Sequence, residues 1–113
     1  MEKLMFQLYS NNNKTIDLEC NYVIKDNIYK FKIDENIYLF DNNKHILTKK
    51  MVDGLLRINM HDSNMIYTLG TNGKDYILSL NDSKLLLNDK SLEYYYSIPD
   101  NGINNKIIIK WDY

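Results

Sequence analysis

Two histidines and one cysteine are the side chains in this sequence best suited to acid–base, nucleophilic or metal chemistry. A zinc site needs three or four ligands, so His45 and His61 would have to recruit scattered carboxylates. His45 follows a turn-forming segment and His61 precedes one, and both are therefore predicted to be solvated strand ends. Cys20 lies among alternating apolar residues, which predicts a buried structural cysteine and no nucleophile.

Asp17 and Glu19 form the one carboxylate pair with a spacing that suggests a site. Two carboxylates on one face of a strand could act as a glycosidase-like acid and base, or could hold calcium. A solvated outer face explains the pair equally simply and is the favoured interpretation. The sequence contains no glycine-rich phosphate loop, EF-hand pattern or nucleophile elbow. It therefore predicts a protein that is not an enzyme and that holds no cofactor or metal.

Arg57 is the only arginine and lies in the middle of an apolar alternating segment, residues 55–60. The favoured interpretation is a charge that points outward into solvent. The functional alternative places Arg57 at the mouth or in the lumen of a barrel, where its planar guanidinium would bind a carboxylate or phosphate.

The tyrosines are the second unusual feature. Several fall on predicted inward faces, where apolar rings with hydroxyl groups would suit a small amphipathic ligand. The favoured interpretation, however, is that the same rings fill the core of the barrel. Tyr95 must face away from both of its tyrosine neighbours, which makes it a candidate exposed aromatic for protein contacts. The inward-facing set is Tyr22, Tyr29, Tyr67, Tyr76, Tyr94 and Tyr96.

An alternation of apolar and polar residues with a period of two runs through most of the chain, as expected for half-buried strands. No segment sustains the apolar spacing of an amphipathic helix. The alternating segments are 16–24, 28–33, 55–60, 65–69, 76–80, 92–98 and 107–111.

Short segments rich in Asn, Asp and Gly separate these strands and predict tight hairpin turns. About ten short antiparallel strands joined in this way form an up-and-down meander. Because an open meander would leave two long exposed edges, closure into a small up-and-down barrel is the simplest arrangement. The sequence therefore predicts one all-β barrel domain over residues 1–113.

Composition limits the partners and the location. Fourteen basic residues, thirteen of them lysine, balance fifteen acidic ones, and no basic run exceeds two residues. Nucleic-acid binding, which needs clustered positive charge, is therefore not expected. A single cysteine excludes an internal disulfide framework. Neither a signal peptide nor a membrane-spanning segment is recognised, so no membrane association and a cytoplasmic location are predicted.

The order of these features resembles the YwiB-like family of small bacterial calycin-type β-barrels. The resemblance implies a closed lipocalin-like barrel in the bacterial cytoplasm, and it implies no activity, because that family is functionally uncharacterised. It rests on residues 16–22, 27–29, 55–60 and 65–68, on Gly73, and on residues 76–80, 92–98 and 107–110.

The leading functional expectation is a non-enzymatic module that binds a small amphipathic or anionic ligand through Arg57 and the inward tyrosines. The alternative is a protein-interaction or scaffold barrel with a packed lumen, and an enzyme without a recognisable motif ranks third. Either a monomer or a homodimer fits, because an unpaired strand edge invites pairing with a second copy.

Overall fold

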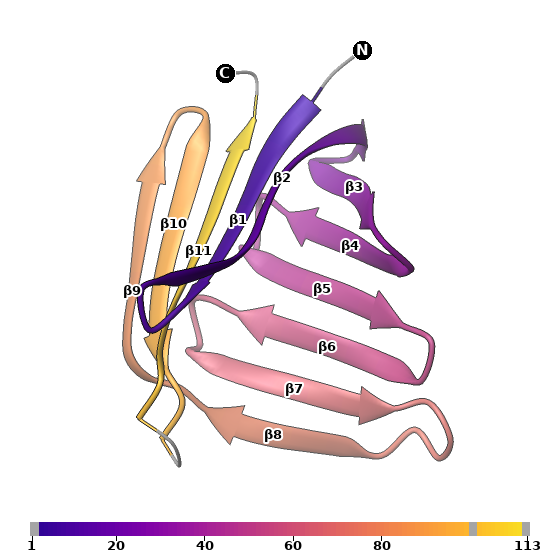
Figure 1. Cartoon of the computed structure of the whole chain (residues 1–113). Coiled ribbons are helices and arrows are strands. Elements are labelled where there is room, and N and C mark those ends of the chain that lie inside the picture. Colours follow the sequence, from indigo (N-terminus) through magenta and orange to yellow (C-terminus); the bar gives the residue numbers. More distant parts are fainter. Residues whose placement is uncertain (1–2, 100–101, 112–113) are drawn as a thin grey trace. The chain divides into compact units, whose positions relative to one another are not determined.

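The computed structural model describes residues 3–99 and 102–111, and all regular structure in them is β-strand. The strands are β1 (Lys3–Ser10), β2 (Asn13–Lys25), β3 (Ile28–Ile33), β4 (Asn36–Asp41), β5 (Ile46–Met51), β6 (Gly54–Asn59), β7 (Asn64–Leu69), β8 (Asp75–Ser79), β9 (Asn81–Asn88), β10 (Ser91–Ser97) and β11 (Asn104–Trp111). Their hydrogen-bonded order is β8-β7-β6-β5-β4-β3-β2-β1-β11-β10-β9 (Figure 1). The predicted all-β class and its antiparallel up-and-down meander are confirmed. The part of the chain that the structure describes has no helix with the length and apolar character needed to cross a membrane.

The strands group into two compact units. The first unit contains β1, the first part of β2, and β9 to β11, and the second unit contains the end of β2 and β3 to β8. Strand β2 contributes to both units: residues 13–21 pair with β1 in the first unit, and residues 22–25 pair with β3 in the second. The predicted extent of one domain over residues 1–113 stays a prediction.

Asparagine and aspartate form the tight turns, as predicted. Asp26 and Asn27, between β2 and β3, have φ angles of 54° and 64°. Positive φ at both central residues is the signature of a type I′ hairpin turn, which Asn and Asp tolerate. The pair Asp53-Gly54 is predicted to form such a turn, but Gly54 instead pairs with Met51 as the first residue of β6 and is not among the residues with positive φ.

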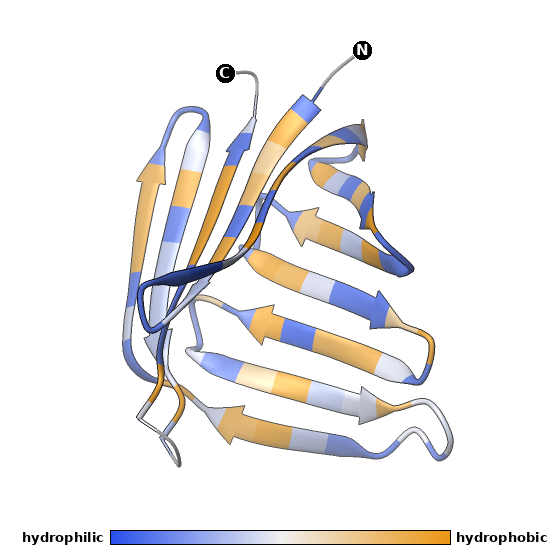
Figure 2. Cartoon of the chain, viewed as in Figure 1, coloured by the Kyte–Doolittle hydropathy of each residue, from blue (hydrophilic) through white to orange (hydrophobic). Residues whose placement is uncertain are grey.

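The first unit has one apolar face, and its other face is mostly polar apart from the buried Ile108. Leu92 on β10, Ile109 on β11 and Phe6 on β1 are directly opposite one another and are at most 1% exposed. The next row has the same character, with Tyr94 opposite Ile107. Because side chains alternate between the faces of a strand, the intervening residues turn to the other side. Figure 2 shows apolar and polar bands along these strands, with unbroken apolar runs at Leu85 to Leu87 in β9 and Ile107 to Ile109 in β11.

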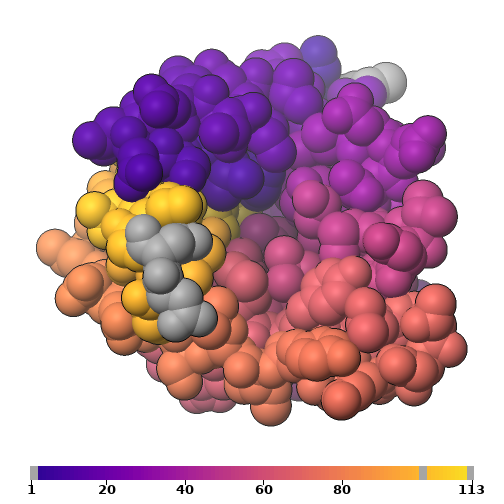
Figure 3. Space-filling model, turned by 60° about the horizontal axis from the view of Figure 1, so that its bottom comes forward, coloured from indigo at the N-terminus to yellow at the C-terminus, as the bar shows by residue number. Residues whose placement is uncertain are grey.

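The second unit also buries one face. Its strands succeed one another in chain order across the surface (Figure 3). Phe40, Leu47 and Ile58 occupy one cross-strand row and are between 0% and 5% exposed. Burial of large apolar side chains is the main source of stability in such a sheet. The opposite face is more open, with Val23 66% and Ile77 69% exposed.

Candidate functional site

A single row of side chains crosses the buried face of the second unit from β2 to β8. Directly opposite residues of antiparallel strands share a face, so the register alone places these side chains together. We call this set the aromatic row. It consists of Tyr22, Phe31, Tyr38, Lys49, Leu56, Tyr67 and Tyr76, in strand order.

The aromatic row is closely packed at its β2–β4 end. Tyr22, Phe31 and Tyr38 are between 2% and 8% exposed. The rings of Phe31 and Tyr38 stack, with centroids 5.2 Å apart and planes within 7°. Tyr29 joins them, because its ring centroid lies 5.1 Å from that of Tyr22. Tyr22 and Tyr29 are therefore brought together as predicted, but as packed rings of the core.

The row becomes more accessible toward β8. Tyr67 is half-buried, and Tyr76, directly opposite it, is 48% exposed. Lys74 places its ammonium 5.3 Å from the centroid of the Tyr76 ring, within cation–π range. This end of the row therefore combines accessible aromatic surface with a nearby positive charge.

Lys49 is the one charged member of the aromatic row. It lies between Tyr38 and Leu56, is half-buried, and holds its Nζ 5.9 Å from the centroid of the Tyr38 ring. Among the described residues, no carboxylate lies within ion-pair distance of Lys49. A cation on an aromatic face without a carboxylate partner can bind an anionic group.

Gly54 makes room for the ring of Tyr67. A Cβ at Gly54 would lie 2.8 Å from the carbonyl oxygen of Thr68 and 2.9 Å from the hydroxyl of Tyr67. Both distances are shorter than a carbon–oxygen contact tolerates. Glycine is therefore required here by close approach, and it lets the Tyr67 ring lie over the start of β6.

Arg57 does not share a face with the tyrosines, which the functional alternative of a common ligand site would require. It is directly opposite Ile66, whereas Tyr67 is opposite Leu56, so alternation puts Arg57 on the other face of the sheet. There its Nη2 lies 4.0 Å from Oδ2 of Asp75. The favoured interpretation, an outward-pointing charge, agrees with this position.

Tyr94 and Tyr96 belong to the first unit and are buried there. Tyr94 is 0% and Tyr96 7% exposed, and their rings stack with centroids 5.5 Å apart. Burial, followed by the neighbouring Tyr94, raises the pKa of Tyr96 to about 12. With no accessible surface, Tyr94 packs the core and does not line a binding space.

Cys20 and the Asp17–Glu19 pair offer no catalytic arrangement. Cys20 is buried, and burial raises the pKa of its thiol, which disfavours the reactive thiolate. Asp17 accepts hydrogen bonds from Gln7 and Lys14, which lower the pKa of its carboxyl. Glu19 pairs separately with Lys3 at 3.3 Å. The two carboxylates lie on an exposed face, as expected, and each has its own partner.

Tyr95 is half-buried, contrary to the expected exposed aromatic. Its hydroxyl donates to Glu93 over 3.2 Å, and Lys106 lies between it and Tyr9, 5.9 Å and 4.3 Å from the two ring centroids. The Tyr95 ring is therefore engaged within the first unit.

The histidines are the feature that sequence reasoning missed. Nδ1 of His45 lies 2.7 Å from Nε2 of His61, a hydrogen bond between residues 16 apart. The signal was present in the sequence: each histidine is in the loop of an alternate hairpin, β4–β5 or β6–β7, and alternate hairpins turn at the same end of a meander.

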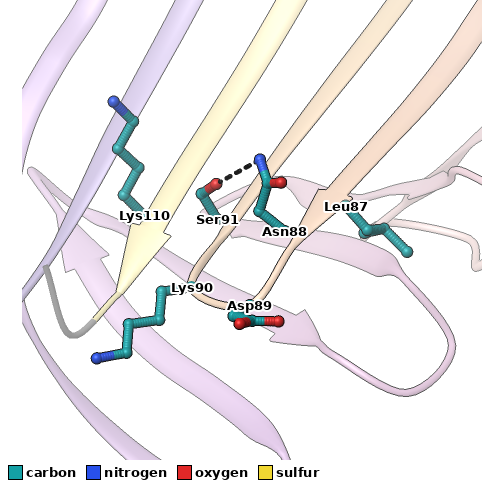
Figure 4. A pocket seen from close by; sticks show the side chains of 6 residues that line it. All are labelled: Leu87, Asn88, Asp89, Lys90, Ser91 and Lys110. Carbon is teal, nitrogen blue, oxygen red and sulfur yellow. Dashed lines mark hydrogen bonds between the residues drawn. The ribbon is translucent and has the colours of Figure 1, made fainter.

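A concavity of about 920 Å³ lies at the β9–β10 hairpin and is open to solvent. It is lined by Leu87, Asn88, Asp89, Lys90, Ser91 and Lys110. Asn88 donates to Ser91 over 3.3 Å, while Lys90 and Lys110 extend in different directions (Figure 4). Because its charges do not converge, it is a weaker candidate than the aromatic row.

Compared with models of known protein families, with curated protein sequences and with solved structures, the chain gives no significant match. The resemblance to the YwiB-like family stays a prediction. The function must therefore be argued from the side chains themselves.

Proposed function

We propose that this protein is a non-enzymatic binding module and that the β5–β8 part of the aromatic row takes a small amphipathic ligand with an anionic group. Lys49 carries the proposal, because it is a half-buried cation on an aromatic face with no carboxylate partner among the described residues. Lys49 replaces Arg57 as the cation that would contact the ligand.

The chemistry of the row suits such a ligand. Tyr67 and Tyr76 offer accessible aromatic surface, which favours contact with a ring or an alkyl chain. Lys49, whose Nζ lies over Tyr38, and Lys74, whose Nζ lies over Tyr76, supply positive charge for a carboxylate, sulfonate or phosphate. Sites for small molecules typically combine an apolar lining with a few polar groups in this way.

A fluorescence titration with anilinonaphthalene sulfonate, an aromatic anion, tests this site. Lys49→Met should weaken binding about tenfold, the equivalent of ~1.4 kcal/mol for a lost charge-assisted contact. Lys50→Met is the matched control, because Lys50 is the next residue, is exposed, and faces the other side of β5. Equal affinities in the two variants would contradict the site.

A second candidate function, protein interaction, is favoured by the open face of the second unit. Ile77 is 69% and Val23 66% exposed, on the face that also carries the half-buried Ile66 and Leu39. Exposed apolar side chains that share a face are typical of a protein contact surface. Ile77→Lys should then abolish any self-association seen by light scattering, and an unchanged dimer would count against this face.

A further inference from the structure

The hydrogen-bonded histidines are placed where two loops meet. His45 ends the loop between β4 and β5, and His61 lies in the loop between β6 and β7. Both loops turn at the left-hand end of the second unit's strands in Figure 1. The main chains are joined directly, because Met60 donates its N–H to the carbonyl oxygen of His45 over 3.1 Å.

Aspartate and asparagine side chains hold both loops. Oδ1 of Asp41 accepts from the main-chain N–H groups of Asn43 and Lys44, at 2.9 Å and 3.0 Å. In the other loop, Asn59 and Asp62 exchange two hydrogen bonds of 3.0 Å and 3.1 Å. The backbone on which each imidazole stands is therefore fixed before any ligand arrives.

His45 adopts an uncommon backbone conformation, with a φ of 54°. Histidine occupies this left-handed region more often than most residues but at some cost in free energy. The conformation turns the imidazole toward His61, and the ring centroids lie 4.8 Å apart.

From this geometry we infer that His45 and His61 form a two-imidazole chelate for a divalent late transition metal ion. Two metal–nitrogen bonds of about 2.0 Å at right angles would place the nitrogens about 2.8 Å apart, whereas a tetrahedral angle needs about 3.3 Å. The observed separation of 2.7 Å is that of a hydrogen bond and is within about 0.1 Å of the right-angled value, so the nitrogens need little displacement, but each ring must rotate to direct its lone pair at the ion and not at the other nitrogen. Right-angled nitrogen ligands are typical of tetragonal Cu(II) and Ni(II) sites.

Metal binding requires a change in the protons of the pair, because the two facing nitrogens are joined by a hydrogen bond. A neutral imidazole is the form that binds metal. When the metal binds, it displaces the proton that joins the two rings. This proton is balanced by one taken up on the other nitrogen of the same ring, so a pair of neutral imidazoles releases no net proton.

The histidine pair is open to solvent, so a metal ion can reach it and water can complete its coordination. His61 is exposed and His45 half-buried. Residues 3–99 and 102–111 contain no cluster of three or more His, Cys, Asp or Glu side chains able to hold a metal. The chelate therefore has two protein ligands, and water completes the coordination. Cu(II) should bind more tightly than Ni(II) or Zn(II), following the general affinity order.

Calorimetric titration with copper(II) chloride tests the chelate in the full chain. One Cu(II) per chain is expected, and His45→Asn and His61→Asn should each weaken binding at least about tenfold, since even supporting groups around a metal contribute that much. Asparagine tolerates the left-handed backbone of residue 45, so the first variant should keep its loop. Lys44→Gln, in the same loop, is the control and should bind as the wild type does.

Electron paramagnetic resonance of the Cu(II) complex supplies a second readout that does not depend on affinity. Two coordinated nitrogens are expected in the wild type and one in each single variant. Unchanged affinity in both histidine variants, no binding by the wild type, or coupling to fewer than two nitrogens would each overturn the inference. If the variant that combines His45→Asn and His61→Asn kept full copper affinity, the copper would be an adventitious ion only, held at the chain terminus or by surface carboxylates.

Discussion

Arg57 and Tyr67 lie on opposite faces of the same sheet, although their strands β6 and β7 are adjacent. Arg57 is directly opposite Ile66, and Tyr67 is directly opposite Leu56. Because successive residues of a strand face opposite sides of the sheet, Arg57 and the aromatic row lie on different faces. The cation that shares a face with Tyr67 is Lys49, and this relationship determines which substitutions should affect a ligand.

Replacing Arg57 should leave ligand binding intact. Its ion pair with Asp75 is 4.0 Å long and both side chains are partly exposed, so Arg57→Met should change the free energy of unfolding by less than about 1 kcal/mol. Affinity for anilinonaphthalene sulfonate should match that of the wild type in the same titration. A loss of affinity as large as that of Lys49→Met would show that Arg57 contacts the ligand.

Leucines 92 and 87 should differ sharply in their contribution to stability. They are directly opposite each other on β10 and β9, but Leu92 is 0% and Leu87 50% exposed. Leu92→Ala should lower the free energy of unfolding by about 2–5 kcal/mol because it leaves a cavity. Leu87→Ala should cost less than about 1 kcal/mol. Urea denaturation of the two variants measures both values, and similar losses would show that the core is assigned to the wrong side chains.

Gly54→Ala should destabilise the second unit. The added methyl group would meet the backbone of β7 and the hydroxyl of Tyr67, so the strands must move, at a cost of roughly 1–3 kcal/mol. Gly73→Asn is the control, because Gly73 has a φ of +66° and open space around it, and asparagine tolerates that conformation. Urea midpoints compare the two, and a Gly54→Ala protein as stable as the wild type would refute the close approach.

Tyr96 should make stability fall at high pH. Burial raises its pKa to about 12 in the folded chain, against about 10 in the unfolded chain. The folded state thus holds the proton more tightly, and this stabilisation is present below pH ~10 and is lost as the pH rises toward about 12. Urea midpoints between about pH 9 and 11 should fall less steeply for Tyr96→Phe than for the wild type. Parallel curves for the two proteins would contradict the shift.

Much of the fold could be predicted from the sequence because alternation is strong where one face of a strand is buried. In residues 55–60, Ile58 and Met60 fall on the predicted inner face and are 5% and 3% exposed. Strands β1, β4, β5 and β9 were not among the predicted segments. Strand β4 is apolar on both faces between Ile37 and Phe40, and β9 carries consecutive leucines at 85–87, so a period of two is hidden in both.

The candidate site was only partly predictable. Tyr22, Tyr29 and Tyr67 were assigned correctly to the inner face, since each follows a clear alternation. Lys49 was missed because a charged residue that alternates with Leu47 and Met51 does not look apolar. The histidine pair depends on contact between two loops, and this contact is visible only once the register of β5 against β6 is known.

Native mass spectrometry of the freshly purified protein, mixed with excess dodecanoate, tests the proposed ligand site most directly. A mass excess of one ligand is expected, which vanishes under denaturing conditions, is kept by Lys50→Met and is much reduced in Lys49→Met. A wild-type mass equal to that of the polypeptide alone, or equal occupancy in the two lysine variants, would contradict a ligand site on the aromatic row.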